Sequence, residues 1–301
     1  MSRIIVTGAT GYIGAHVVAL LMKEGYEVYT VSRPTSSFDL VKRIAPCFEA
    51  YKSFRYRGEV EDLIRFFDEV KPDVVIHIAA LYIAEHKPRD IHNLIMSNVG
   101  FSTEILEATA RSGCKMFINT STSWQHYDKE GRVPACLYAA TKASVERIID
   151  YYVDAYNMRG ISLTIFDSYG PNDPRKKIVN ILRDLVKNGG TIKMSAGEQK
   201  MSLVYIDDLA NAYLTAIHHM EKVDKKQNQV FYLRAKKQYS LKEIARCFEE
   251  ITNRKLDIIW GGREYRSREV MAPYMGGKLL PGWEPQISIK EGLAKLLYSE
   301  N

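Results

Sequence analysis

The stretch TGATGYIG, residues 7–14, places three glycines between a β-branched segment and an amphipathic one. RIIVT, residues 3–7, is typical of a buried strand, and residues 12–23 have the apolar spacing of a helix that stops before Gly25. A glycine turn that joins a strand to a helix lets backbone amides at the helix N-terminus approach a phosphate closely. We therefore predict a dinucleotide pyrophosphate site in preference to a merely structural turn. Its expected contacts are Gly8, Thr10, Gly11, Tyr12, Ile13 and Gly14.

The same alternation of strand-like and helical segments continues through the first half of the chain. The expected strands are EVYTVS (27–32), SFRYR (53–57), VVIHIA (74–79), KMFINT (115–120) and ISLTIF (161–166). The expected helices lie at residues 62–69, 93–111 and 138–157. Strands that alternate with helices predict a parallel sheet covered on both faces, which is a doubly wound, Rossmann-type α/β fold.

The second half of the chain is less regular. Residues 178–187 and a segment that begins at Asp207 favour helices, TIKM (191–194) favours a strand, and Ser240 with Glu243 forms a capping-box pattern. We interpret residues 1–170 as a dinucleotide-binding domain. Residues 171–301 are interpreted mainly as a smaller α/β substrate lobe, with some segments that return to the first sheet.

Composition excludes several classes of protein. The chain has 301 residues, 46% of them hydrophobic and 26% charged, with a formal charge of +6, and its basic residues are interspersed with acidic ones. This is typical of a globular protein and gives little support to a nucleic-acid partner. The four cysteines form no C-x-x-C pair, so we expect no zinc site and a reduced, cytoplasmic setting. No apolar run reaches the roughly 18 residues of a membrane span.

The segment LYAATKASVERIID, residues 137–150, places Tyr138 one helical turn before Lys142. At this spacing the two side chains share a face, so the ammonium could lower the pKa of the phenol. Taken alone, the pair could equally be surface decoration. The hydroxyl-rich strand end at residues 120–123 and the glycine turn favour a catalytic role.

Taken together, these motifs resemble the extended short-chain dehydrogenase/reductase family, whose members mostly act on nucleotide sugars. The resemblance covers nearly the whole chain. It includes the Gly-x-x-Gly-x-x-Gly turn, YAATK, GEVED, HIAA, SNVGFSTEILEA, NTSTSW, SYGP and LVYIDDLANA, in the order of the family.

The resemblance implies roles for individual residues. Tyr138 would be the catalytic acid/base, Lys142 would tune it and bind the nicotinamide ribose, and Thr122 would hold the substrate oxygen. Thr120, Ser121 and Ser123 remain alternatives for that hydroxyl. Further cofactor contacts implied by the resemblance are Glu59, Val60, Ala79, Ala80 and Asn98. The expected substrate contacts are Ser123, Trp124 and Tyr138, with Arg175, Arg263 and Arg266 as candidates for the diphosphate.

The end of the second expected strand indicates which cofactor is used. An acidic residue there usually binds the ribose 2′-hydroxyl of NAD, but this chain has Ser32 and Arg33. Because arginine can pair with a 2′-phosphate, we predict NADP(H); the alternative is an Arg33 that only meets solvent. A reductase must exchange spent cofactor for fresh NADPH, whereas an epimerase recycles a tightly held NAD. A preference for NADP(H) therefore favours net reduction.

We therefore predict a reductase that acts at C4 of a nucleotide-linked 4-keto-6-deoxy or 3,6-dideoxy sugar. The runs TSWQHYD, YGPNDPRKK and REVMAPYMGGKLLPGW are similar to the CDP-abequose and paratose synthase group of the family. The alternatives are a 4-epimerase with tightly bound NAD and a non-catalytic, NADP-binding or scaffold member.

The family also suggests a homodimer that is formed by the two long helices at residues 93–111 and 138–157. An apolar stripe on the second helix supports this, although the stripe could instead face the sheet. Its members are Val145, Ile148, Ile149 and Tyr152.

Overall fold

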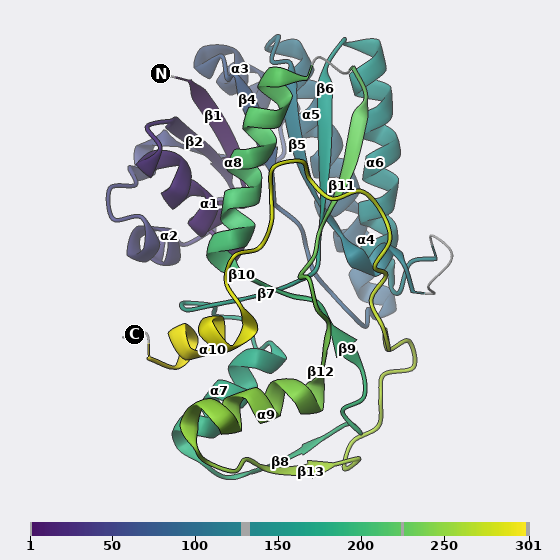
Figure 1. Ribbon diagram of the computed structural model, residues 1–301. Coiled ribbons are helices and arrows are strands. Elements are labelled where there is room, and N and C mark those ends of the chain that lie inside the picture. The colour runs from purple at the N-terminus through teal and green to yellow at the C-terminus, as the bar shows by residue number, and fades with distance from the viewer. Residues whose placement is uncertain (1, 128–132, 224–225, 299–301) are drawn as a thin grey trace.

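The computed structural model describes residues 2–127, 133–223 and 226–298, in which a large sheet lies above a smaller lobe (Figure 1). All seven strands of the sheet run parallel, in the order β11-β6-β5-β4-β1-β2-β3. They are β1 (Arg3–Thr7), β2 (Glu27–Ser32), β3 (Ser53–Arg55), β4 (Val74–His77), β5 (Met116–Thr122), β6 (Arg159–Ile165) and β11 (Asn228–Leu233). The order reverses between β1 and β4, so the prediction of a doubly wound Rossmann-type sheet is confirmed.

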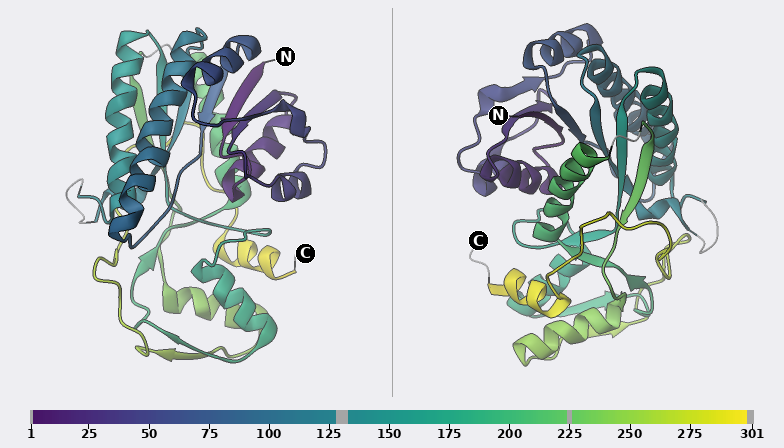
Figure 2. Two further views of the ribbon diagram at one scale, coloured as in Figure 1. Left: turned by 180° about the vertical axis from the view of Figure 1, so that it is seen from behind. Right: turned by 45° about the horizontal axis from the view of Figure 1, so that its top comes forward.

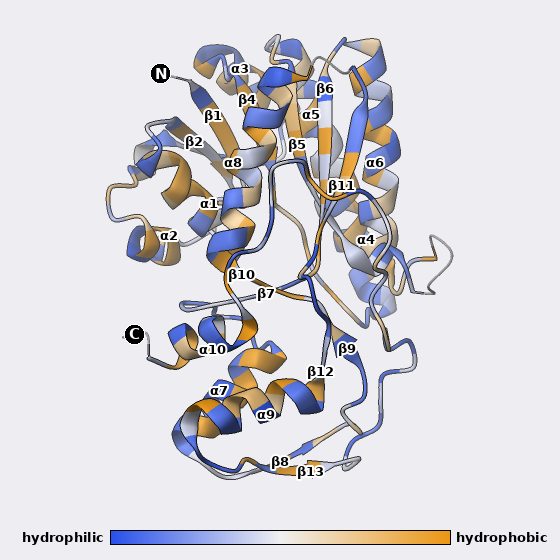
Figure 3. Cartoon of the chain, viewed as in Figure 1, coloured by the Kyte–Doolittle hydropathy of each residue, from blue (hydrophilic) through white to orange (hydrophobic). Residues whose placement is uncertain are grey.

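Helices cover both faces of the sheet (Figure 2). One face carries α1 (Tyr12–Lys23), α2 (Asp39–Ile44) and α8 (Ile206–Lys222), and the other carries α3 (Val60–Val70), α5 (Phe101–Arg111) and α6 (Leu137–Ala155). Alternate residues of a strand point to opposite faces. Ile4 and Val6 of β1 accordingly pack with α1 and α8, whereas Ile5 packs with α3 and α5. Figure 3 shows β1 as largely hydrophobic, which follows from this two-sided burial.

The expected helix at residues 93–111 is interrupted. It consists of α4 (Ile91–Ile95), a π-helical segment at Met96–Gly100, and α5. Asn98 lies at the centre of this wider turn. Its side chain hydrogen-bonds to the loop after β4 and to α6. Such π segments inside α-helices are frequent at functional sites.

The apolar stripe of α6 packs inside the chain. Val145 and Ile149 are fully buried and Tyr152 nearly so, in the cluster that joins α6 to α5 and the sheet, and Ile148 packs partly against it. The alternative that the stripe faces the sheet is therefore correct. The homodimer stays a prediction, and the apolar stripe of α6 no longer supports it.

The smaller lobe consists of short strand pairs and three helices. The strands are β7 (Asp167–Tyr169), β8 (Thr191–Met194), β9 (Lys200–Met201), β10 (Leu203–Tyr205), β12 (Tyr239–Ser240) and β13 (Asp257–Trp260). The helices are α7 (Ile178–Asn188), α9 (Leu241–Thr252) and α10 (Ile289–Tyr298). The capping box is confirmed: the Glu243 backbone N–H donates to Ser240 Oγ (3.1 Å), and the Ser240 N–H donates to Glu243 Oε2 (2.7 Å).

The C-terminal segment connects the two parts of the molecule. In Figure 1 it leaves β13, passes β11 and returns to α10. The Tyr232 N–H of β11 donates to the carbonyl of Lys278 (2.8 Å), and Trp283 Nε1 donates to the carbonyl of Asp208 (2.8 Å). The sequence did not single out β11 as a strand. No helix within the described residues is both long and apolar enough to cross a bilayer.

Candidate active site

The glycine turn packs tightly between β1, α1 and the loop after β4. The Gly11 N–H donates to the Gly8 carbonyl (2.9 Å), and Gly8 has a φ of +74°. A Cβ on Gly14 would lie 2.1 Å from the Gly8 oxygen, and one on Gly8 would lie 2.6 Å from the Ala79 nitrogen. Only glycine fits at these two positions, so the N-terminus of α1 comes close to the end of the sheet.

A cavity of about 740 Å³ opens at the carboxyl ends of the strands, where ligands bind in sheets of this kind. It brings together most of the residues that the sequence indicated. These are Gly8, Thr10, Gly11, Tyr12, Ile13, Gly14, Ser32, Arg33, Ala79, Ala80, Thr122, Ser123, Trp124, Tyr138, Lys142 and Arg175. The predicted pyrophosphate turn and the predicted catalytic pair therefore share one cavity.

Lys142 and Tyr138 both line this cavity, Lys142 fully buried and Tyr138 half-buried. Lys142 is 1% exposed, and its Nζ has no hydrogen-bond partner among the described residues. Burial lowers the pKa of Lys142 to about 8, and the charge of Glu146 opposes that shift. Burial also raises the pKa of the Tyr138 phenol, and the positive charge of nearby Arg175 opposes this shift. The Tyr138 pKa is therefore not lowered as the sequence suggested, because desolvation outweighs the nearby positive charge.

The hydroxyls at the end of β5 have different partners. Thr120 Oγ1 lies 2.7 Å from Tyr213 Oη, and Ser121 Oγ donates to Glu146 Oε1 (2.7 Å). Thr120, Thr122 and Ser123 line the cavity, and Ser121 does not. Among the described residues, Thr122 Oγ1 accepts a long bond from the Trp124 N–H (3.3 Å), so it is less engaged than Thr120 Oγ1. The geometry thus favours Thr122 over Thr120 and Ser121 as the group that meets a substrate oxygen.

Asn98 is fully buried and lies outside the cavity lining. Its Oδ1 accepts from the Leu81 N–H (2.7 Å), and its Nδ2 donates to the Leu81 carbonyl and to Thr141 Oγ1, each at 3.0 Å. Thr141 Oγ1 donates in turn to the carbonyl of Tyr138 (2.7 Å). These contacts use the side chain internally, so Asn98 holds the loop after β4 against the start of α6.

Arg33 lies exposed on the rim of the cavity, directly after β2. A second cavity of about 590 Å³ adjoins it and shares Thr10, Arg33 and Ser36 with the first. Two more arginines, Arg43 of α2 and Arg183 of α7, line this second cavity. Ser36 and Arg43 were not indicated by the sequence analysis, although both follow Arg33 closely in the chain.

Glu59 and Val60 do not line the cavity. Glu59 is exposed as the N-cap residue of α3, and Val60 begins that helix. The cavity is lined instead by Tyr56 and Gly58, which precede Glu59 in the chain, and by Phe101 of α5. The rings of Tyr56 and Phe101 stack with their centroids 5.5 Å apart. Sequence reasoning missed this pair, because its two members lie 45 positions apart.

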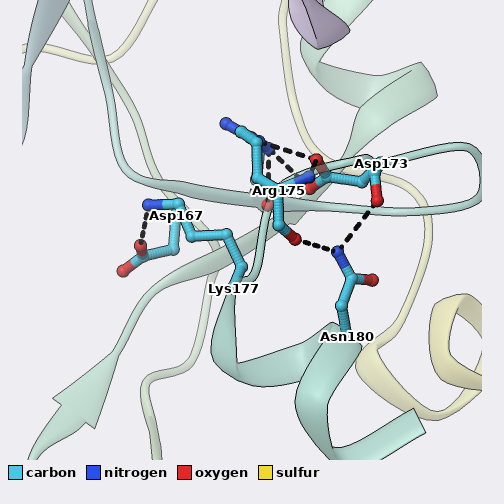
Figure 4. A network of polar contacts seen from close by, with 6 residues as sticks. Asp167, Asp173, Arg175, Lys177 and Asn180 are labelled. Atoms are coloured by element: carbon cyan, nitrogen blue, oxygen red, sulfur yellow. Dashed lines mark hydrogen bonds and ion pairs between the residues drawn. The ribbon is translucent and has the colours of Figure 1, made fainter. Parts of the chain in front are cut away.

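Arg175 is held by internal contacts (Figure 4). Its Nε donates to Asp173 Oδ1 (2.7 Å) and its Nη2 to Asp173 Oδ2 (2.8 Å), with a further bond to Ser168 Oγ (3.1 Å). Asn180 donates to the carbonyls of Asp173 (3.2 Å) and Arg175 (2.8 Å), which fixes the loop before α7. A guanidinium in a bidentate pair with a buried carboxylate has little freedom to turn toward a ligand.

Lys177, two residues later, lines the same cavity with a looser environment. Its Nζ lies 3.9 Å from Asp167 and 4.9 Å from the centroid of the Tyr82 ring (Figure 4 shows the Asp167 pair). Lys177 was not among the residues that the sequence indicated, although it stands in the same run as Arg175. Arg263 and Arg266 lie outside the cavity lining. Arg266 nevertheless lies close enough to Tyr82 to oppose the burial that raises the Tyr82 pKa to about 12.

Comparison with known proteins identifies the family. The profile of the NAD dependent epimerase/dehydratase family matches residues 4–231. The chain belongs to this family. CDP-abequose synthase from Yersinia pseudotuberculosis is 34% identical over 275 residues, which cover 90% of this chain and 91% of that protein. A UDP-glucuronate 4-epimerase from Thermodesulfobacterium geofontis is 25% identical and spans 98% of this chain and 95% of its own.

Solved structures of the epimerase/dehydratase family share the fold. The UDP-glucose 4-epimerase of Thermotoga maritima, determined with UDP-glucose, has a TM-score of 0.82 and 25% identity, and covers 98% of this chain and 97% of its own. The Thermus thermophilus UDP-glucose 4-epimerase, in complex with NAD, has a TM-score of 0.81 at 22% identity over 98% and 97% of the two chains. The resemblance inferred from the sequence motifs is thereby confirmed.

The residues of this member of the epimerase/dehydratase family fit a nicotinamide dinucleotide. The amides at the start of α1 suit a pyrophosphate, and the glycines leave room for it. The Nζ of Lys142 is buried and has no partner within the described part of the chain, so it suits a ribose hydroxyl at the other end of the cavity. A buried ammonium without a hydrogen-bond acceptor is costly unless a ligand supplies one.

Proposed function

We propose that this protein is an NADPH-dependent reductase of a nucleotide-linked 4-keto-6-deoxy sugar, with Tyr138 as the proton donor to the C4 oxygen. One observation carries the proposal: Arg33 lies on the rim of the cavity that contains Tyr138 and Lys142. The 34% identity to a CDP-abequose synthase supports a reductase that acts on a deoxy sugar.

The chain's own groups divide the chemistry among them. A bound NADPH would supply the hydride. Thr122 Oγ1 holds the ketone oxygen by a hydrogen bond, and Tyr138 gives that oxygen its proton. Lys142 stabilises the phenolate that is left, because its ammonium lies one helical turn away on the same buried face.

Cofactor selection rests on the end of β2. Ser32 and Arg33 occupy the place where an acidic residue would bind the 2′-hydroxyl of NAD. Arg33 offers a guanidinium to a 2′-phosphate, and the neighbouring cavity adds Ser36 and Arg43. An arginine-lined cavity beside the adenosine end favours the phosphorylated cofactor.

The substrate end is built from Lys177 and an aromatic wall. Lys177 is the cation in the cavity whose carboxylate partner lies at the long distance of 3.9 Å, so its ammonium is the better candidate for the substrate diphosphate. Arg175 would act by fixing the loop through Asp173. Tyr82 and Trp124, with ring centroids 5.7 Å apart, would pack against the sugar.

The test is to mix the protein with NADPH and CDP- or dTDP-4-keto-6-deoxyglucose, and to follow the absorbance of the reduced nicotinamide. Consumption that depends on the keto sugar, with NMR of the product to show reduction at C4, is the expected result. Absence of consumption with every 4-keto donor in a panel of nucleotides would overturn the proposal.

A nucleotide-sugar 4-epimerase is the second candidate, because structural relatives with this activity match almost the whole chain. An epimerase recycles its cofactor within the site. Protein purified without added cofactor would then carry bound NAD and interconvert C4 epimers with no net consumption of NADPH. Release of NAD on denaturation, measured by absorbance and mass, decides between the two.

A further inference from the structure

Behind the cavity, Glu146 lies on α6 one turn after Lys142 and is 1% exposed. Its Oε1 accepts hydrogen bonds from Ser121 Oγ and from Gln125 Nε2, both at 2.7 Å. Gln125 Nε2 also donates to Ser121 Oγ. A carboxylate is therefore held, almost without solvent contact, between the catalytic helix and the end of β5.

We propose that Glu146 is a positioning residue that keeps the buried Lys142 ammonium charged and holds the end of β5 beside it. This inference rests on the proposed function, since it assigns Glu146 a part in the same reaction. Two features of the geometry support it. Residues four apart on a helix are neighbours, and both members of the pair are fully buried. A buried ammonium keeps its proton only where an opposite charge or acceptors compensate for the lost water.

The other titratable groups around Lys142 cannot take this role. His77 on β4 is held between Thr7 Oγ1 and Ser102 Oγ, each 2.8 Å from one of its ring nitrogens, and burial keeps its pKa well below the ordinary value. Tyr138 on α6 and Tyr213 on α8 have pKa values raised by burial. All three groups are thus neutral near pH 7, which leaves Glu146 as the carboxylate beside Lys142 within the described residues.

Glu146 also reaches the other half of the site. Ser121 directly precedes Thr122, and Gln125 follows Trp124, so both residues bonded to Glu146 flank the segment that lines the cavity. One carboxylate thereby fixes the hydroxyl strand end relative to the lysine. The two groups come from different elements, β5 and α6, and the Glu146 carboxylate links them.

The charge on Lys142 can be measured without cofactor or substrate. The protein is labelled biosynthetically with [ε-¹³C]lysine, the Lys142 signal is assigned by its loss in Lys142→Met, and its shift is followed from pH 6 to pH 10. In the unchanged protein we expect a midpoint of about 8. In Glu146→Gln the midpoint falls by about 1 unit or more, because an opposite charge within reach stabilises the protonated form.

Matched variants separate charge from packing. Asp150→Asn removes a carboxylate from the same helix, but Asp150 is partly exposed and pairs with Arg147 (2.9 Å), so the Lys142 midpoint stays where it was. Ser121→Ala removes one hydrogen bond and keeps the charge, so the midpoint again stays. If Glu146→Gln does not fold, Glu146→Met carries the same prediction, since it has similar length and no polar atom to leave unpaired.

The outcomes are distinct from those of the reductase assay. If Glu146→Gln folds and the Lys142 midpoint is unchanged, Glu146 is only a structural residue and the inference is wrong, whatever the protein reduces. If the midpoint falls, the pH profile of kcat supplies a second readout. Activity that needs the ammonium is lost as pH rises through the Lys142 pKa, so the alkaline limb moves to lower pH in Glu146→Gln.

Discussion

The ring of Tyr82 meets the ring of Tyr138 edge to face, with centroids 5.1 Å apart and planes at 79°. Tyr82 comes from the loop after β4, and Tyr138 from the first turn of α6, so the contact joins two separate elements at the mouth of the site. The ring of Trp124 also lies beside Tyr82, with centroids 5.7 Å apart. The three rings thus form an aromatic wall beside the proposed proton donor.

Removal of the Tyr82 ring should impair turnover. In Tyr82→Ala we expect kcat/KM for the 4-keto sugar to fall about 3- to 10-fold, the range that corresponds to one lost aromatic contact. Tyr82→Phe keeps the ring and should remain close to the unchanged protein in steady-state kinetics. A loss in Tyr82→Phe as large as in Tyr82→Ala would show that the hydroxyl, and not the ring, is what the reaction uses.

Tyr138→Phe tests the proton donor directly. The substitution removes the phenolic proton and keeps the ring, so kcat should fall about 10²- to 10⁴-fold, the usual size of a general-acid contribution. The NADPH dissociation constant, measured by fluorescence, should not change. Tyr152→Phe is the matched control, because Tyr152 lies on the same helix with its hydroxyl bonded to Glu107 (2.9 Å), away from the cavity. Full activity in Tyr138→Phe would remove Tyr138 from the mechanism.

Arg33→Ala tests the choice of cofactor. A lost charge-assisted hydrogen bond costs about 1.5–3 kcal/mol, so the affinity for NADPH should fall about 10- to 150-fold while that for NADH stays the same. Calorimetric titration of both cofactors measures the two effects. Arg65→Ala, which removes an exposed arginine paired with Asp62, should change neither affinity. Equal losses for NADPH and NADH would contradict a role with the 2′-phosphate.

Asn98→Ala tests the link between the loop after β4 and the catalytic helix. The substitution removes the partner of the Leu81 N–H and carbonyl, and the bond that Thr141 Oγ1 accepts, so the free energy of unfolding should fall by about 1–3 kcal/mol. Turnover should also fall, because Thr141 bonds to the carbonyl of Tyr138. Thr141→Val is expected to give a smaller loss of stability in urea unfolding. If Asn98→Ala were as stable and as active as the unchanged protein, the hydrogen bonds of Asn98 would contribute to neither stability nor turnover.

Much of the fold could be predicted from local patterns. The helix at Tyr12–Lys23, the strand at Glu27–Ser32 and the capping box at Ser240 were all predicted with their correct bounds, because each depends on residues within a few positions of one another. The π-helical segment at Met96–Gly100 was missed, since nothing local distinguishes it from a continuous helix. The segment positions Asn98 for contacts with Leu81 and Thr141, which lie 17 and 43 positions away in the chain.

The candidate site divides in the same way. By itself the sequence determined the glycine turn, the Tyr138–Lys142 pair and the Ser32–Arg33 strand end, because short-range spacing decides which side chains share a turn or a face. Only the tertiary structure decided that Arg175 is tied to Asp173 while Lys177 lies loosely in the cavity, and that Glu146 bonds to Ser121 and Gln125 behind Lys142. Hydrogen-bond partners and desolvation depend on which elements the sheet brings together, and spacing along the chain does not contain that information.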